Sequence, residues 1–226
     1  MARATRSRRL RPRGDRVLSR GLVSVGGRAY TSAMRADTFF LLSDAALRSV
    51  IDRVQPGDFD KPVPASWSSF ENPTVRHLLR SHAYDEAWVP GVLAGKSIAD
   101  GDELRDKDLL GYDPIAAYDA LNDTATAAVE AGVDVDSTFH FQYGDYPADE
   151  GLSHLAMYRA TQAWMIAKHL GIPFHLSPEL IEGLNEWVIP HADEWRSFGV
   201  FPPAIEPPAD ADDETRVLCA MGFWGP

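Results

Sequence analysis

Cysteine is almost absent from this chain of 226 residues, which contains only Cys219. A single thiol excludes an internal disulfide bond and a metal site built from several cysteines. Cys219 lies in the apolar segment 217–221, so we expect a buried, unreactive thiol rather than a nucleophile.

Long apolar runs are also missing. No stretch approaches the roughly 18 to 20 residues that a membrane-spanning helix requires. Hydrophobic residues make up 45% of the sequence, which at this length is enough for one sizeable core. We therefore expect a cytoplasmic protein that has no membrane partner.

Basic residues are scarce outside the first 33 positions. Residues 1–33 hold nine arginines and one acid, whereas the remainder has 13 basic and 32 acidic residues. The acidic remainder argues against nucleic-acid binding, because a protein binds phosphate backbones through a basic face. We predict that residues 1–33 form a disordered basic extension and that residues 34–226 form one folded domain.

Familiar catalytic motifs are missing as well, since the sequence has no G-x-S-x-G, no P-loop and no H-E-x-x-H. Asp145, Asp149 and Glu150 crowd the expected start of a helix, where acids stabilise the helix dipole. His82 and Glu86 have i, i+4 spacing, which we interpret as a pair on a solvated helix surface. We therefore favour these interpretations over an acid–base pair among the three acids and over a metal-ligand pair at His82 and Glu86.

Helix signals dominate what the sequence does contain. Three capping residues precede a proline, as at many helix starts, and four glycines follow periodic apolar segments, as at many helix ends. The capping residues are Asn72, Asp113 and Ser177, and the glycines are Gly95, Gly132, Gly171 and Gly199. The predicted helices span residues 34–54, 73–94, 113–131, 147–170, 178–197 and 211–221. Only residues 137–143 alternate like a strand, so the predicted fold is mainly all-α.

Five segments occur in an order and spacing that resemble a known family: residues 74–95, 113–118, 144–171, 176–180 and 207–218. The first resembles "TVRxLLxHLVGxxxWxxxLLAG", and the third resembles a helix that begins near "YPA" and carries metal ligands. Together they resemble the DinB-like helical bundles, in particular the bacterial group typified by the metal-binding domain of mycothiol-dependent maleylpyruvate isomerase. This resemblance implies a four-helix bundle with a long crossover between the second and third bundle helices, together with accessory helices and a short strand-like segment.

The family's metal ligands are replaced in the helix that starts near residue 147. Aligning Trp164, Ala167 and Gly171 with their family counterparts places Tyr158 at the position of the acidic ligand and Gln162 at that of a histidine. Neither side chain is a usual metal ligand.

The earlier ligand helix differs in the same way. There the family histidine falls on Ser81, and His82 lies one residue away, about 100° around the helix. The resemblance therefore implies that all three ligand positions have changed. We expect no resident metal or other cofactor, and we assign no catalytic or cofactor-binding residue.

Polar residues at the old ligand positions form the candidate site. We predict that Ser81, Tyr158 and Gln162 line a small, partly polar pocket with His77 and His154 at one end, and that the three bond to one another or to ordered water. The resemblance implies that the second and third bundle helices run parallel. If this holds for the helices that carry His77 and His154, the two histidines would face each other and would be the ligands of a displaced metal site.

Two hypotheses about function remain open. The first is a bundle without metal that binds a small molecule or has a structural role, in either case as a monomer or a homodimer. The second is a divalent-metal-dependent thiol transferase or isomerase that uses displaced ligands such as His77 and His154. Its cofactors would be Zn²⁺ or Ni²⁺ and mycothiol, and the metal would generate the nucleophilic thiolate.

Overall fold

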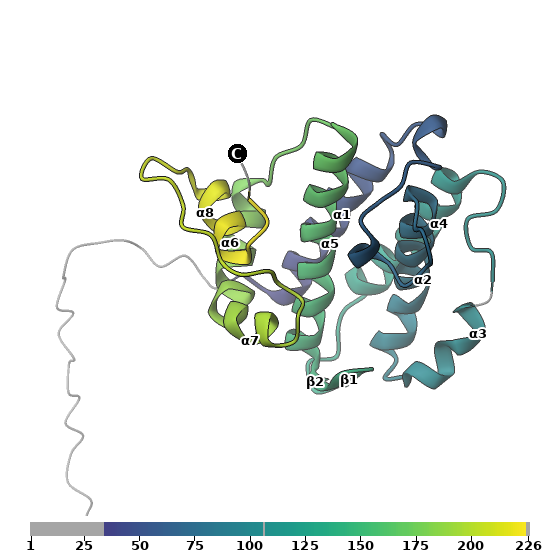
Figure 1. Cartoon of the computed structure of the whole chain (residues 1–226). Helices are drawn as coiled ribbons and strands as arrows, with labels where there is room; N and C mark the ends of the chain where they lie inside the picture. Colours follow the sequence, from purple (N-terminus) through teal and green to yellow (C-terminus); the bar gives the residue numbers. More distant parts are fainter. Residues whose placement is uncertain (1–33, 106, 225–226) are drawn as a thin grey trace, which may run out of the picture. The chain divides into compact units, whose positions relative to one another are not determined.

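The computed structural model describes residues 34–105 and 107–224, and these residues belong to one compact unit, Ala33–Pro226. The extension predicted for residues 1–33 lies outside the described residues. The described part is mainly helical, as expected, and contains one two-stranded sheet (Figure 1). None of its helices is both long and apolar enough to cross a membrane.

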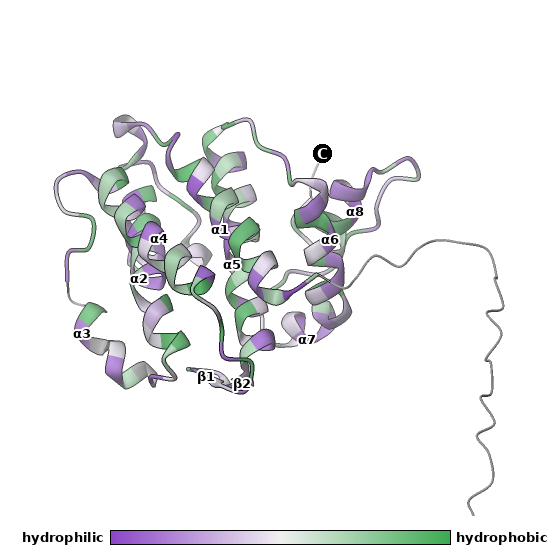
Figure 2. Cartoon of the chain, turned by 180° about the vertical axis from the view of Figure 1, so that it is seen from behind, coloured by the Kyte–Doolittle hydropathy of each residue, from purple (hydrophilic) through white to green (hydrophobic). Residues whose placement is uncertain are grey.

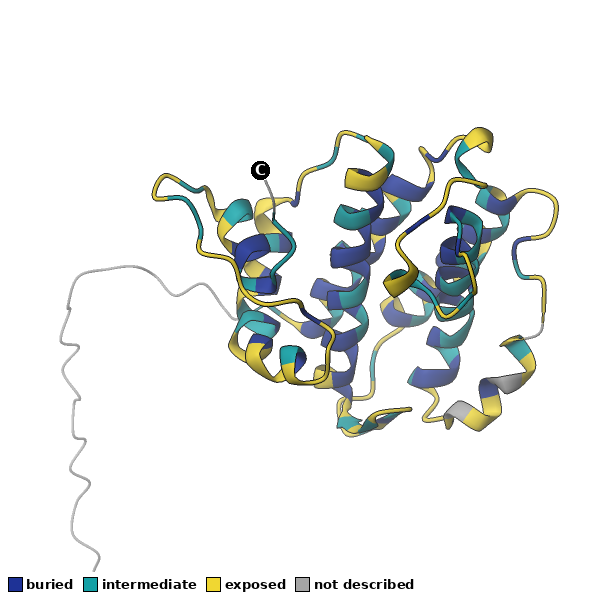
Figure 3. Cartoon of the chain, viewed as in Figure 1, coloured by how far each residue is buried: buried dark blue, intermediate teal, exposed yellow. Residues whose placement is uncertain are grey.

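Four long helices form the centre of the described unit. They are α1 (Ala36–Ile51), α2 (Val75–Leu93), α4 (Pro114–Glu130) and α5 (Ala148–Leu170). Helix α1 packs mainly against α5, and α2 packs mainly against α4. Their facing sides are buried, whereas the loops around them are largely exposed (Figure 3).

Contacts along the helices give their directions. Arg76 donates to the carbonyl oxygen of Gly111, just before α4, and further along both helices Glu86 accepts from Tyr118, so α2 and α4 run parallel. At the other end of α2, Val92 lines a pocket together with His154, near the start of α5. The first half of α2, through Leu79, packs instead with the second half of α5, through Ile166, so α2 and α5 are antiparallel.

Apolar side chains from these helices form two buried clusters. One joins the second half of α1, the first half of α2 and the second half of α5, through residues such as Leu47, Leu79 and Ile166. The other includes Phe39, Leu152 and residues of the C-terminal helices. The hydropathy colouring shows the mixture of apolar and polar residues along each helix (Figure 2).

Local capping explains several helix ends. The side chains of Asp113 and Ser177 accept hydrogen bonds from the backbone N–H groups of Ala116 and Leu180, both at 3.2 Å. Gly171 ends α5 with a φ of 69°, a left-handed conformation that favours glycine.

The predicted cap at Asn72 is wrong. Helix α2 begins at Val75, and Thr74 is its N-cap residue, which forms a capping box with His77. Asn72 instead adopts a φ of 50° in the preceding loop. Asn72 and Pro73 therefore belong to the loop that precedes α2 rather than to its cap.

The helix predicted over residues 178–197 is divided into three elements. These are α6 (Pro178–Trp187), a 3-10 turn (Ile189–His191) and α7 (Ala192–Ser197). Pro190 lies in the 3-10 turn and lacks a backbone N–H, so it cannot make the hydrogen bond that would continue α6.

The remaining elements are short. The expected strand appears as β1 (Thr138–Phe141), which pairs antiparallel with β2 (Gly144–Pro147), so that Phe139 is opposite Tyr146. The sequence did not predict β2 or the short helix α3 (Asp102–Arg105). The last helix, α8, spans Asp213–Met221, close to its predicted bounds.

The cap of α6 makes a direct test of helix stabilisation. Changing Ser177→Ala removes the side-chain acceptor for the Leu180 N–H and should lower the free energy of unfolding by about 1 kcal/mol. Urea denaturation would measure this loss. The control Ser49→Ala changes an exposed hydroxyl on α1 and should stay within about 0.5 kcal/mol of the unmodified protein. Equal effects of the two changes would contradict a capping role.

Candidate functional site: a pocket between α2 and α5

A pocket of about 720 Å³ lies between α2 and α5, and we name it the α2–α5 pocket. Helix α2 lines it with Ser81, Tyr84, Asp85, Trp88, Val89 and Val92, and α5 lines it with His154, Leu155, Met157, Tyr158 and Arg159. The β1–β2 hairpin, α7 and the chain after α7 supply further apolar walls. Side chains from distant parts of the sequence thus enclose one space.

Exposed apolar side chains gather at this pocket. Tyr143 of the hairpin, Phe198 after α7 and Val200 all line it, and they are 56%, 64% and 45% exposed. Leaving large apolar groups in water is unfavourable, and such groups commonly mark a binding surface when they cluster. The rim of the pocket therefore has the character of a ligand-binding site.

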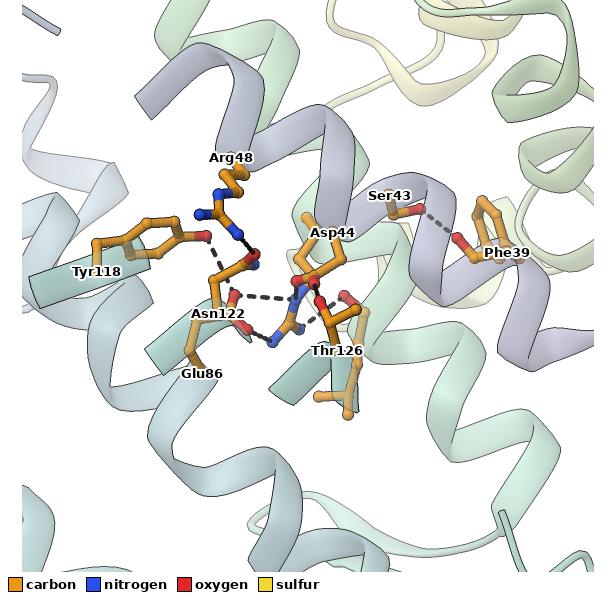
Figure 4. Close-up of polar contacts among 10 residues, drawn as sticks. Phe39, Ser43, Asp44, Arg48, Glu86, Tyr118, Asn122 and Thr126 are labelled. Atoms are coloured by element: carbon orange, nitrogen blue, oxygen red, sulfur yellow. Dashed lines mark hydrogen bonds and ion pairs between the residues drawn. The ribbon is translucent and has the colours of Figure 1, made fainter. Parts of the chain in front are cut away.

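A buried ionic network lies behind the pocket. The Arg159 guanidinium donates to Asp44 at 3.0 Å and to both carboxylate oxygens of Glu86 at 3.1 and 3.0 Å. Tyr118 also donates to Glu86, and Thr126 donates to Asp44. Figure 4 shows Asp44 of α1, Glu86 of α2, and Tyr118 and Thr126 of α4 converging.

Burial and charge compete within this network. Burial alone would lower the pKa of Arg159, but the carboxylates of Glu86 and Asp44 together raise it by more. The net pKa is therefore raised, and the guanidinium stays protonated. Burial raises the pKa of Glu86 against the opposing effect of Arg159. A buried charge is tolerated only when it is paired and hydrogen-bonded, and the two ion pairs of Arg159 connect α5 to α1 and α2.

Asp85 differs from its buried neighbours. It lines the α2–α5 pocket and has no hydrogen bond or ion pair with any residue in the described part of the chain. Burial raises the pKa of Asp85 to about 7, while the charge of Arg159 lowers it and that of Glu86 raises it. Its carboxylate is therefore available to a molecule in the pocket.

Two histidines near the pocket are held neutral. Burial lowers the pKa of His82 to about 3, with a further contribution from the charge of Arg159. Burial also lowers the pKa of His154 to about 4. His154 packs between the rings of Tyr146 and Trp195, each with its centroid 4.6 Å away. His154 is therefore part of the pocket wall, whereas His82 is buried beside the ring of Tyr158.

A second groove of about 730 Å³ continues along α5 from the α2–α5 pocket. The two spaces share Met157, Tyr158 and Val200 as walls. The groove contains Gln162 and carries the charge of Lys168, whereas the pocket contains the unpaired Asp85. Tyr158 thus lies where two chemically different sites meet.

The predicted polar cluster of Ser81, Tyr158 and Gln162 is not formed by direct contacts. Ser81 and Tyr158 line the α2–α5 pocket, but Gln162 lies in the neighbouring groove. Ser81 donates to the His77 carbonyl oxygen at 3.3 Å, and the Gln162 amide lies 3.8 Å from the Met165 sulfur atom. The three side chains therefore form no direct hydrogen bonds with one another, because successive turns of α5 border separate spaces.

His77 and His154 do not face each other. Nδ1 of His77 accepts from the Thr74 backbone N–H at 3.1 Å, within the capping box of α2. Because α2 and α5 are antiparallel, His77 and His154 lie on opposite sides of the level at which His82 meets Tyr158. The helical rise places them roughly 13 Å apart along the axis. Within the described residues, no group of three or more His, Cys, Asp or Glu side chains is arranged to hold a metal ion.

The interpretation of His82 and Glu86 as a solvated pair is also wrong. Both are buried, with exposures of 1% and 0%, because α2 packs against α5 on one side and α4 on the other. Glu86 pairs with Arg159 rather than with His82. By contrast, the expectation of a buried Cys219 is confirmed, and burial raises the pKa of its thiol.

The structure also reveals site residues that the sequence did not single out. Asp85, Trp88 and the hairpin residue Phe141 line the pocket, and Arg159 forms its charged backing. Spacing along α2 places Trp88 one turn from Asp85 and Tyr84, a pattern that would have indicated a shared helix face. No local pattern connects Phe141 to that face.

The fold and the site define a class: a mainly helical protein with an aromatic pocket between two antiparallel helices. Comparison of the chain with protein-family models, with curated proteins and with solved structures finds no match. The functional argument therefore rests on the pocket itself.

Proposed function

We propose that the protein binds a small organic molecule in the α2–α5 pocket. The observation that carries this proposal is a pocket of about 720 Å³ that opens to solvent, is lined by aromatic rings and is bordered by exposed apolar side chains. This volume lies within the range of about 300 to 1,000 Å³ that is typical of small-molecule sites. The ionic network behind the pocket keeps α1, α2 and α5 in fixed positions, so the walls are formed before a ligand arrives.

We also propose that the four long helices form a DinB-like bundle. The order α1, α2, α4, α5 supports this, as do the parallel α2 and α4 joined by the long connection over residues 94–113. In this proposal, Ser81 and Tyr158 stand at two positions where the DinB-like family has metal ligands. Both line the α2–α5 pocket, which binds a small molecule in place of a metal ion.

A neutral aromatic probe tests the proposed binding. N-phenyl-1-naphthylamine should bind with a 1:1 stoichiometry, and its fluorescence should rise because the pocket is apolar. Ser81→Trp would place an indole in the pocket and should weaken binding at least about tenfold, since the ring occupies the ligand's space. Fluorescence titration measures both affinities.

The matched control is Ser49→Trp, which adds the same side chain to an exposed position on α1 and should leave probe binding unchanged. Circular dichroism establishes that each variant is folded, and Ser81→Met provides a smaller obstruction if the tryptophan is not tolerated. Unchanged affinity in folded Ser81→Trp and Ser81→Met would refute the proposed site.

A further inference from the structure

The charge inside the α2–α5 pocket identifies the ligand more closely. Asp85 is half-buried, and its carboxylate has no partner among the described residues. A carboxylate in such a place is stabilised by a ligand that carries a positive charge or a strong hydrogen-bond donor.

The cationic residues at the pocket do not fill this role. Arg159 is already bound by Asp44 and Glu86, two carboxylates against one guanidinium. Arg105 also lines the pocket but is exposed, and its guanidinium lies over the Tyr84 ring, 5.6 Å from the centroid. The charges closest to Asp85 therefore leave the pocket with an excess of negative charge.

The rings around Asp85 suit the same type of ligand. Trp88 lies on the next turn of α2, and Phe141 and Trp195 line the pocket from the hairpin and α7. The face of an aromatic ring attracts a cation, with tryptophan the most effective. The large excess of acids over bases in residues 34–226 also favours the approach of cations.

We propose that the α2–α5 pocket binds an organic ammonium ion, whose charged nitrogen pairs with Asp85 and whose apolar body packs among the aromatic rings. This inference rests on the proposed function and specifies the class of its ligand. Neutral molecules of the same shape fit the pocket but lack the ionic contact.

Binding of an amine should therefore depend on pH. The pKa of Asp85 is raised to about 7, so its charge is lost below neutral pH, whereas an alkylamine stays protonated up to a pH of about 10. The charges of Glu86 and Arg159 act on Asp85 from the buried side. The other titratable groups that line the pocket with Asp85 include Tyr143, Tyr158, His154 and Arg105. His154 stays neutral over this pH range because burial lowers its pKa to about 4. Affinity for the amine should fall about tenfold between pH 8 and pH 5.5.

Three probes of one shape provide the test: 4-phenylbutylamine, 4-phenylbutanol and 4-phenylbutyrate, each competing with N-phenyl-1-naphthylamine. At pH 8 the amine should bind about tenfold tighter than the alcohol, and the acid should bind most weakly. In Asp85→Asn, the amine should lose this advantage and its pH dependence, while the affinity for the uncharged alcohol should fall far less. Asp60→Asn makes the same chemical change at an exposed site and should alter nothing.

The outcomes separate this inference from the proposed function. If the dye and the alcohol bind in the pocket but the amine binds no tighter, or if Asp85→Asn leaves its advantage intact, the ammonium inference is overturned and the binding function stands. Tightest binding of the acid would assign recognition to Arg105 and would also overturn it. If neither the dye nor any competitor binds, the proposed function itself fails.

Discussion

Replacing Arg159 with methionine is expected to lower the free energy of unfolding by about 3 to 5 kcal/mol. The guanidinium is 1% exposed and is the only described cation that contacts the carboxylates of Asp44 and Glu86. Its removal leaves two buried acids without a counter-charge at the junction of three helices, and the hydrogen bonds from Tyr118 and Thr126 offset only part of this desolvation cost. Urea denaturation at pH 8, where unpaired acids are most costly, would measure the loss.

Two further variants make this result specific. Arg35→Met removes an exposed arginine whose pair with Asp37 lies at the surface, and it should change the free energy of unfolding by less than about 1 kcal/mol. Adding Glu86→Gln to Arg159→Met should recover part of the loss, because it removes one of the stranded charges. A loss below about 1 kcal/mol for Arg159→Met would show that the network does not hold the helices together.

His82→Leu is expected to make the protein less sensitive to acid. Burial lowers the pKa of His82 in the folded state to about 3, whereas in the unfolded chain its imidazole has the ordinary pKa of 6.5. Below pH 6.5 the unfolded state binds the proton and the folded state does not, so stability falls as pH decreases towards 3. Between pH 7.5 and pH 5.0 the free energy of unfolding of the variant should improve by roughly 2 kcal/mol relative to the unmodified protein.

His82→Leu also alters packing, but it does so equally at both pH values. The decisive quantity is therefore the change in the free energy of unfolding between pH 7.5 and pH 5.0, compared between the variant and the unmodified protein. His154 and Asp85 titrate in the unmodified protein and in the variant alike, so their effects cancel in the comparison. His191→Leu, at a side chain that is 60% exposed, serves as the control and should show no such relative change. Parallel pH profiles for His82→Leu and the unmodified protein would mean that His82 is accessible to protons in the folded state.

The sequence predicted the long helices because their ends are set by local chemistry. Ser177 and Asp113 cap the helices that follow them, and Gly171 takes the left-handed conformation that ends α5. The predicted helix over residues 178–197 failed at Pro190, where apolar periodicity continues but a backbone donor is missing. Helix ends that depend on one residue and its neighbours could thus be predicted. The end of α6 was missed because the apolar periodicity was given more weight than Pro190.

The site was harder to predict because its contacts join distant residues. Arg159 is separated from Asp44 by 115 positions and from Glu86 by 73, and nothing in the local sequence connects them. The sequence placed His82 and Glu86 on a solvated face because it could not show that α2 packs on both sides. Ser81 and Tyr158, which the sequence singled out, line the pocket, yet the pocket's acid, Asp85, was missed because a single carboxylate carries no spacing signal.

A crystal structure of the protein with 4-phenylbutylamine would test the central claim most directly. We predict density for one molecule between α2 and α5, with its nitrogen at hydrogen-bonding distance from the Asp85 carboxylate and its ring against Trp88 or Phe141. Density confined to the neighbouring groove beside Gln162, or an empty α2–α5 pocket at saturating amine, would contradict it.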